Sequence, residues 1–266
     1  MDLGLAGKRA LVTGGSRGIG RAIAHELARE GAAVAICARD GKAAEAAAAE
    51  LSAETGARVI AFRADTGRDA DVKRLVASAA QTLGGLDVLV NNAARVGGTG
   101  GPDTLAELNE QILLDDFNVK IMGYLRCARE AAPHMETGGW GRIVNIDGMA
   151  ARVAGGVSGG MRNAAVVNFT KVLSEEFGPK GITVNAVHPG TTRTERLAGR
   201  LAATAERRGI TPAEAEEAVV QQIAIRRIVG AEEIASVVAF LCSEQAGCIT
   251  GEAISASGGS TKAVFY

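Results

Sequence analysis

The sequence has few aromatic residues, and they are unevenly distributed. Phe, Trp and Tyr make up 3% of its 266 residues, and only two of them are tyrosines. No tyrosine lies between Tyr124 and Tyr266, and no lysine lies between Lys120 and Lys171. The middle of the chain, residues 125–170, therefore offers neither a phenol nor an ammonium group for proton transfer.

Other absences limit the kind of protein this can be. A formal net charge of −1 gives no electrostatic reason to expect nucleic acid or an anionic membrane as a partner. No stretch approaches the roughly 18 apolar residues of a membrane span, and residues 1–8 lack the apolar centre of a signal peptide. Four cysteines lie far apart, without the paired spacing of a zinc site or a disulfide framework. We therefore expect a cytoplasmic protein with reduced thiols and no metal.

The chain instead alternates short apolar runs with helical patterns, which favours one α/β domain over residues 1–266. Arg9–Thr13 reads as a strand and runs into the glycine-rich turn Gly14–Gly20, after which helical spacing continues to Gly31. Glycines let the backbone approach phosphate groups, and the N-terminus of a helix favours negative charge. This segment predicts a dinucleotide site, although a tight strand-to-helix turn alone also accounts for it.

The spacing Thr13-Gly14-x-x-x-Gly18-x-Gly20 resembles the short-chain dehydrogenase/reductase family. Further matching segments follow in the family's order: Asn91–Ala94, Asn118–Gly123, the predicted strand Gly141–Ile146, the helix from Ala164 to Thr170, and Pro189-Gly190. The resemblance covers Lys8 to Gly259. It implies a Rossmann-like, doubly wound parallel sheet of about seven strands with helices on both faces, and a homodimer or homotetramer.

The end of the second predicted strand, Ala33–Arg39, bears on the choice of cofactor. Where NAD-preferring members carry an acid for the ribose hydroxyl, this chain has Ala38 and then Arg39. Arg17 and Arg39 together suit a 2′-phosphate, so we predict that NADP(H) is preferred over NAD(H); the alternative is that Asp40 binds the ribose. The residues that the resemblance assigns to the cofactor are Gly14, Ser16, Arg17, Gly18, Ile19, Gly20, Arg39, Asp65, Thr66, Asn91, Ala93, Pro189, Gly190, Thr192 and Thr194.

The family's catalytic residues are missing from the matching positions. The family uses a Tyr, a Lys four residues later that lowers the Tyr pKa, and an upstream Ser that binds the substrate oxygen. Alignment from both flanks places Gly159 at the Tyr, Asn163 at the Lys and Gly148 at the Ser. Loss of a general acid slows a reaction by roughly 10²–10⁴-fold, and loss of one oxyanion donor slows it by roughly 10²–10³-fold. Ordinary ketone reduction therefore needs substitutes for these groups.

Several residues are candidates for that substitute, and each has a structural alternative. Asp147 is an acid or a turn cap, Ser158 a hydroxyl donor or a helix N-cap, and Arg162 a cation or a solvated residue. Asn163 is a neutral donor, and His188 is either a proton donor or a packed side chain. Asn118 matches the family's Asn at a helix kink, within a helix expected to run through His134.

Two segments are expected to cover the site. The loop Val96–Pro102 is either a substrate loop or a surface connection, and residues 191–226 match the family's substrate lid. The leading hypothesis is an NADP(H)-dependent oxidoreductase for a small carbonyl, alcohol or conjugated enone, with altered proton delivery. A cofactor-binding partner without turnover, and a non-redox isomerase or lyase, remain open.

Overall fold

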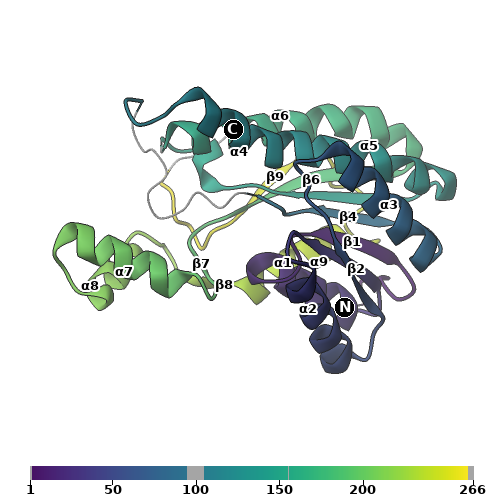
Figure 1. Cartoon of the computed structure of the whole chain (residues 1–266), viewed down its shortest axis with the longest axis horizontal. Coiled ribbons are helices and arrows are strands. Elements are labelled where there is room, and N and C mark those ends of the chain that lie inside the picture. Colours follow the sequence, from purple (N-terminus) through teal and green to yellow (C-terminus); the bar gives the residue numbers. More distant parts are fainter. Residues whose placement is uncertain (1, 95–104, 155, 263–266) are drawn as a thin grey trace.

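The structure is a computed structural model that describes residues 2–94, 105–154 and 156–262. The predicted loop Val96–Pro102 lies outside the described residues. A central sheet stands between two layers of helices (Figure 1). No helix among the described residues has the length and apolar character needed to cross a membrane.

The sheet has seven strands, all parallel, in the order β3-β2-β1-β4-β5-β6-β9. Their bounds are β1 (Arg9–Thr13), β2 (Ala33–Ala38), β3 (Val59–Arg63), β4 (Val88–Asn91), β5 (Gly141–Ile146), β6 (Ile182–Pro189) and β9 (Ala253–Ala256). The strand order reverses between β1 and β4, which is where a doubly wound sheet opens a crevice at its carboxyl edge. The predicted fold is confirmed.

Each face of the sheet is covered by helices that bury their apolar sides. Helices α1 (Gly18–Arg29), α2 (Gly41–Thr55) and α9 (Ala231–Leu241) cover one face, and α3 (Asp69–Leu83), α5 (Ile121–Gly138) and α6 (Val157–Phe177) cover the other. The central strands β1, β4, β5 and β6 are buried on both sides, which explains why they read as continuous apolar runs such as Ala10-Leu11-Val12.

The helix that was predicted to run from Asp115 through His134 is in fact two helices. Helix α4 (Glu110–Val119) ends before Lys120 and α5 begins after it, so that Lys120, with φ of −86° and ψ of −65°, is the cap residue of both helices. The carbonyl of Asn118 accepts from the Arg126 guanidinium at 3.2 Å and that of Val119 from Thr66 Oγ1 at 3.5 Å. Side chains that take helical carbonyls in this way bend a helix.

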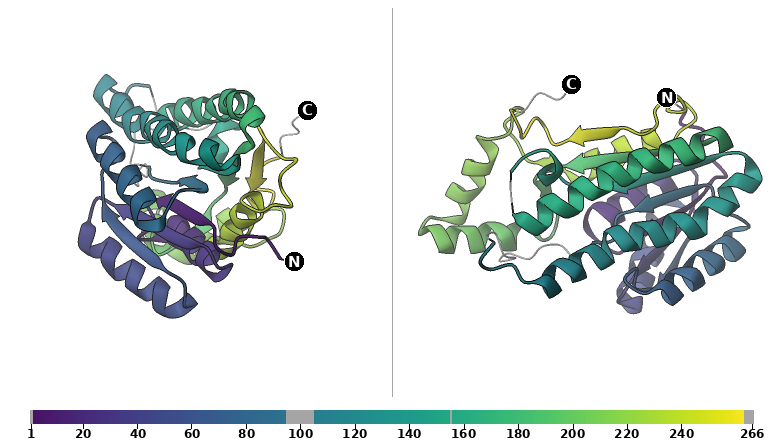
Figure 2. Two further views of the ribbon diagram at one scale, coloured as in Figure 1. Left: turned by 90° about the vertical axis from the view of Figure 1, so that its right-hand side faces the viewer. Right: turned by 90° about the horizontal axis from the view of Figure 1, so that it is seen from above.

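A separate helical pair leaves the carboxyl end of β6. Strands β7 (Thr192–Arg193) and β8 (Val229–Gly230) form its base, and α7 (Leu197–Arg208) and α8 (Pro212–Val220) form the pair itself. Thr211 and Glu214 form a capping box at the start of α8. The pair has a small apolar cluster of its own, and it extends beyond the sheet in Figure 1 and in the right view of Figure 2.

Candidate active site

The glycine turn between β1 and α1 is tied to the end of β4. Thr13 Oγ1 accepts from the backbone N–H groups of Asn92 and Ala93 at 2.9 and 3.0 Å, and Asn92 Nδ2 donates to the Thr13 carbonyl at 2.9 Å. A Cβ at Gly20 would lie 2.3 Å from the Gly14 carbonyl oxygen. Glycine is therefore required at this contact, which brings the N-terminus of α1 against the crevice.

The first turn of α1 has N–H groups available for a ligand. Its N-cap, Arg17, forms no side-chain bond to that turn. The unsatisfied N–H groups and the dipole of a helix N-terminus favour an anion such as a phosphate.

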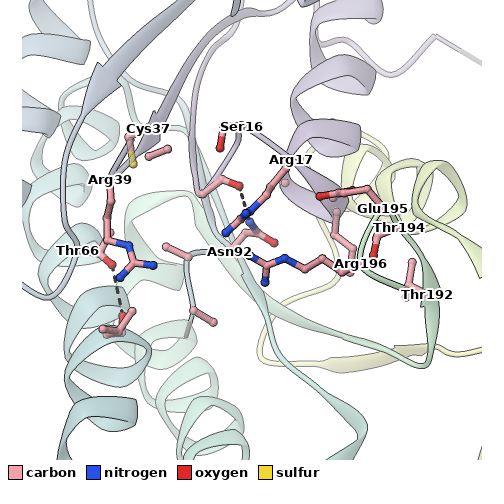
Figure 3. Close-up of a pocket in the computed structure, with 18 of the residues that line it drawn as sticks. Ser16, Arg17, Cys37, Arg39, Thr66, Asn92, Thr192, Thr194, Glu195 and Arg196 are labelled. Atoms are coloured by element: carbon pink, nitrogen blue, oxygen red, sulfur yellow. Dashed lines mark hydrogen bonds between the residues drawn. The ribbon is translucent and has the colours of Figure 1, made fainter. Parts of the chain in front are cut away.

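A pocket opens at this edge of the sheet (Figure 3). Every residue predicted to bind the cofactor lines it, except Asn91 and Pro189. Asn91 is fully buried at the end of β4, where its Nδ2 donates to Asn145 Oδ1 at 3.0 Å, and Pro189 is buried as the last residue of β6. The lining also includes residues that were not predicted: Cys37, Ala38, Ala64, Asn92, Ala94, Val119, Glu195, Arg196 and Arg200.

The pocket is rich in positive charge. Arg17, Arg39 and Arg196 point into it from the glycine turn, the end of β2 and the start of α7 (Figure 3), and Arg200 joins them one turn further along α7. The acids on its lining are Asp65 and Glu195. Burial lowers the pKa of Arg196, and the positive charges of Arg17 and Arg39 lower it further. The arginines are close enough to repel one another while the pocket holds no anion.

Asp40, the alternative ribose ligand, has another role. Its Oδ1 accepts from the backbone N–H of Ala43 at 3.1 Å, which makes it the N-cap of α2.

A buried polar cluster lies at the carboxyl end of β5. Lys120 Nζ donates to Asn163 Oδ1 at 2.7 Å and lies 3.4 Å from Asp147 Oδ1. Asp147 Oδ2 lies 3.2 Å from Nδ1 of His188, whose side chain is completely buried. The cluster thus joins α6, β6 and the residue after β5 at the break between α4 and α5.

Burial lowers the pKa of Lys120 to about 8, although the negative charge of Asp147 acts in the opposite direction. A buried cluster of titratable groups beside a ligand crevice is a candidate for function.

A second charged group borders the first. Asp116 Oδ2 accepts from Ser158 Oγ and from Arg162 NH1, each at 2.6 Å. Ser158 is not the N-cap that was considered as an alternative, because α6 begins at Val157 and its N-cap is Gly156. Arg162 is also not a solvated residue, because its side chain is 15% exposed and paired with Asp116.

Asn118 lies beside the helix break and not at its centre, and the catalytic role expected of Asn118 stays a prediction. The break lies two residues later, at Lys120, while Asn118 Nδ2 donates to the Gly67 carbonyl at 3.1 Å and its Oδ1 accepts from Arg126 at 2.9 Å. Asn118 therefore braces the turn between β3 and α3.

The two glycines at the expected Ser and Tyr positions have different surroundings. A Cβ at Gly148 would lie 2.8 Å from Asn163 Nδ2, whereas the nearest atom to a Cβ at Gly159 is 3.9 Å away. Position 148 has no room for a side chain, and position 159 has room. The phenol of Tyr124 has a structural partner, since its buried hydroxyl donates to the Ile146 carbonyl at 2.7 Å, and burial raises its pKa.

Sequence reasoning missed Lys120, Asp116, Arg196 and Arg200. One signal for Lys120 was present, because a lysine between Val119 and Ile121 interrupts an apolar stretch of the helix. Arg196 and Arg200 lie far along the chain from Arg17, and no local pattern links them.

Comparison with known proteins agrees with this geometry. The family model described as Enoyl-(Acyl carrier protein) reductase matches residues 14–261. The NADPH-dependent reductase BacG of Bacillus subtilis is 33% identical over 97% of this chain and 99% of its own length. The 3-oxoacyl-[acyl-carrier-protein] reductase FabG of Aquifex aeolicus is also 33% identical, over 97% and 99%. The chain belongs to the short-chain dehydrogenase/reductase family.

A solved member of the short-chain dehydrogenase/reductase family has nearly the same fold. L-Sorbose reductase of Gluconobacter frateurii, in complex with NADPH and L-sorbose, superposes with a TM-score of 0.92 at 32% identity and covers 99% of this chain and 100% of its own. The expected class, an oxidoreductase of this family, is confirmed. The complex supports a nicotinamide cofactor for this short-chain dehydrogenase/reductase.

Proposed function

We propose that this protein is an NADP(H)-dependent oxidoreductase that acts on a small carbonyl, alcohol or conjugated enone. The observation that carries the proposal is the charge of the pocket, where four arginines and the start of α1 converge. Arg39 stands after β2, where an acid would favour NAD(H), and the neighbouring Asp40 is used as a helix cap.

The cations of the pocket match the anions of that cofactor. The N-terminus of α1 suits the pyrophosphate, and Arg17 and Arg39 suit the 2′-phosphate. Arg196 and Arg200 add positive charge from the helical pair. When bound, the cofactor supplies or accepts a hydride.

Proton handling would depend on an altered set of groups. Gly148, Gly159 and Asn163 stand where the family's Ser, Tyr and Lys are expected, and the buried Lys120, Asp147 and His188 lie at the same strand end. Ser158 is held by Asp116 beside this cluster. We propose that this cluster replaces the family's usual proton-delivery residues.

The remaining proposals concern the domain organisation, oligomeric state and location of the protein. Residues 1–266 form one domain, and the segment 191–226, which contains α7 and α8, serves as a substrate lid because two of its arginines face the pocket. Exposed Met122 on α5 and Val172 on α6, 41% and 54% exposed, suit subunit packing in a homodimer or homotetramer. A cytoplasmic location stays a prediction.

Nucleotide titration tests the cofactor proposal. Calorimetry should show tighter binding of NADPH than of NADH, and Arg39→Ala should weaken NADPH binding by roughly tenfold or more while affecting NADH less. Arg63→Ala is the matched control, because this exposed arginine ends the neighbouring strand β3 but does not line the pocket. An unchanged NADPH affinity in Arg39→Ala would refute the preference.

An acceptor panel tests turnover. L-Sorbose, a 3-oxoacyl thioester and a conjugated enone would be assayed for NADPH oxidation, the first two because relatives act on them. NADPH binding without turnover would favour a cofactor-binding partner, and conversion without any nucleotide would favour an isomerase or lyase.

A further inference from the structure

The lysine and the asparagine of the active site stand in exchanged positions. The family resemblance places a lysine on α6, where this chain has Asn163, and an asparagine at the kink, where the structure has Lys120. The two side chains still meet, with Nζ donating to Oδ1 at 2.7 Å. The exchange keeps a lysine–asparagine contact and changes the group that each helix presents.

This contact fixes the orientation of the Asn163 carboxamide. An ammonium group has only donors, so it selects the oxygen of the amide, and Nδ2 must point the other way. That direction is toward Gly148, since a Cβ built there would lie 2.8 Å from Nδ2.

The amide nitrogen is available to a ligand. Asn163 Nδ2 donates to no acceptor among residues 2–94, 105–154 and 156–262, and it is not one of the enclosed unpartnered atoms. It is a donor that keeps accessible surface and lacks an acceptor.

The position of Gly148 relates this donor to the cofactor pocket. In the sheet, β5 lies between β4 and β6. Pocket-lining residues follow both neighbours: Ala93 and Ala94 after β4, and Gly190 and Thr192 after β6. Asp147 and Gly148 follow β5, so the donor stands between the two cofactor-lining segments at the carboxyl edge.

Two acids attract the ammonium of Lys120: Asp147 at the end of β5 and Asp116 of α4. Arg162 of α6 repels it but is paired with Asp116, and His188 of β6 contacts the far side of Asp147. Tyr124 of α5 completes the surroundings and donates to the Ile146 carbonyl. The ammonium is thereby kept against Asn163.

The geometry points to Asn163 Nδ2 as the donor that binds the substrate's carbonyl oxygen in place of the family's serine hydroxyl, with Lys120 as the positioning residue that orients the carboxamide. This inference rests on the proposed reductase function. It explains why position 148 is glycine, because a serine there would collide with the amide that replaces its hydroxyl.

Asn163→Asp tests the donor. The carboxylate has nearly the same shape and pairs with Lys120, but it presents an acceptor toward Gly148. With the best acceptor of the panel, kcat/KM should fall by about 100-fold, the typical effect of losing one oxyanion donor, while NADPH affinity stays within threefold. Asn168→Asp is the matched control, because Asn168 is exposed on the same helix. A value of kcat/KM within threefold of wild type in Asn163→Asp would overturn the inference.

Lys120→Met tests the positioning in the free protein, without turnover. In protein labelled with ¹⁵N-asparagine, the NMR signal of the Asn163 side-chain amide should shift with pH around a midpoint near the Lys120 pKa of about 8. The reason is that a neutral Lys120 amine can accept a hydrogen bond as well as donate one, so it no longer selects the amide oxygen. This response should vanish in Lys120→Met and persist in Lys171→Met, whose lysine is exposed on α6. A response that persists in Lys120→Met would overturn the positioning role. If the wild type binds NADPH but reduces no acceptor, the proposed function fails, and this titration alone decides the orientation.

Discussion

The two halves of the crevice differ in composition, because one consists mainly of backbone and the other of side chains. The cofactor half consists mainly of backbone: the glycine turn, the start of α1 and the ends of β1 and β4, joined by Thr13 and Asn92. The half at the end of β5 consists of side chains from α4, α6 and β6 that meet Asp147 around Lys120. The first half contains the residues that were predicted to bind the cofactor, whereas in the second half we propose that other side chains replace those of the family.

The difference follows from what each half must do. A turn that approaches phosphates needs glycine at fixed positions, since any Cβ collides with backbone that cannot move. A cluster of side chains can be rearranged as long as its charges and hydrogen bonds remain satisfied. The contact between Lys120 and Asn163 is one such rearrangement.

Gly20→Ala should disrupt the cofactor half of the crevice, and of the variants that we propose it should have the largest effect on stability and on NADPH binding. The new Cβ would lie 2.3 Å from the Gly14 carbonyl oxygen and 2.4 Å from Asn92 Nδ2. We expect a loss of about 3 kcal/mol in the free energy of unfolding, and NADPH binding weaker by about 100-fold, or about 2.7 kcal/mol. Urea denaturation and calorimetry measure the two effects, and wild-type affinity in this variant would contradict the backbone account.

The same contrast explains what could be predicted from the sequence. The strand β1 and the glycine turn follow from local patterns, and the family resemblance added β5 and the pocket residues of that turn. The helix kink was predicted two residues too early, at Asn118, since the position of the break at Lys120 depends on Thr66 and Arg126 reaching helical carbonyls. Arg196 was missed for a similar reason, because only the excursion through β7 brings it back to the pocket.

The stability of the protein at alkaline pH tests the half of the crevice that surrounds Lys120. The pKa of Lys120 is about 8 in the folded protein and has its ordinary value of 10.5 in the unfolded chain. Between these pH values the unfolded chain binds a proton at Lys120 that the folded protein does not, so the contribution of Lys120 to the free energy of unfolding should rise by roughly 3 kcal/mol in total. The buried thiols of Cys37, Cys127 and Cys242 act in the opposite direction, because burial raises their pKa in the folded protein. Below pH 8 Lys120 is protonated in both states, and its contribution is constant.

Denaturation at several pH values, compared between variants, isolates this contribution. The difference in free energy of unfolding between wild type and Lys120→Met should change by this amount between pH 8 and 10.5, because the cysteines contribute equally to both proteins. The difference between wild type and Lys171→Met, which removes an exposed lysine of α6, should stay constant. The slope is the informative quantity, because Lys120→Met also leaves Asp147 without its cation. Parallel curves for wild type and Lys120→Met would show that Lys120 is not titrating as a buried group.

Gly159→Ala should have the smallest effect and the opposite sign to Gly20→Ala. Position 159 lies in the first turn of α6, and the atom nearest to a new Cβ is the Cβ of Ala150, at 3.9 Å. Alanine is the better helix former and restricts the unfolded chain more than glycine, so we expect a gain of about 0.5 kcal/mol in stability and unchanged NADPH affinity. Thermal unfolding of Gly20→Ala and Gly159→Ala compares the same glycine-to-alanine substitution in the two halves of the crevice. If Gly159→Ala destabilises the protein as much as Gly20→Ala, position 159 is closed, and its glycine is a packing requirement like that of the cofactor turn.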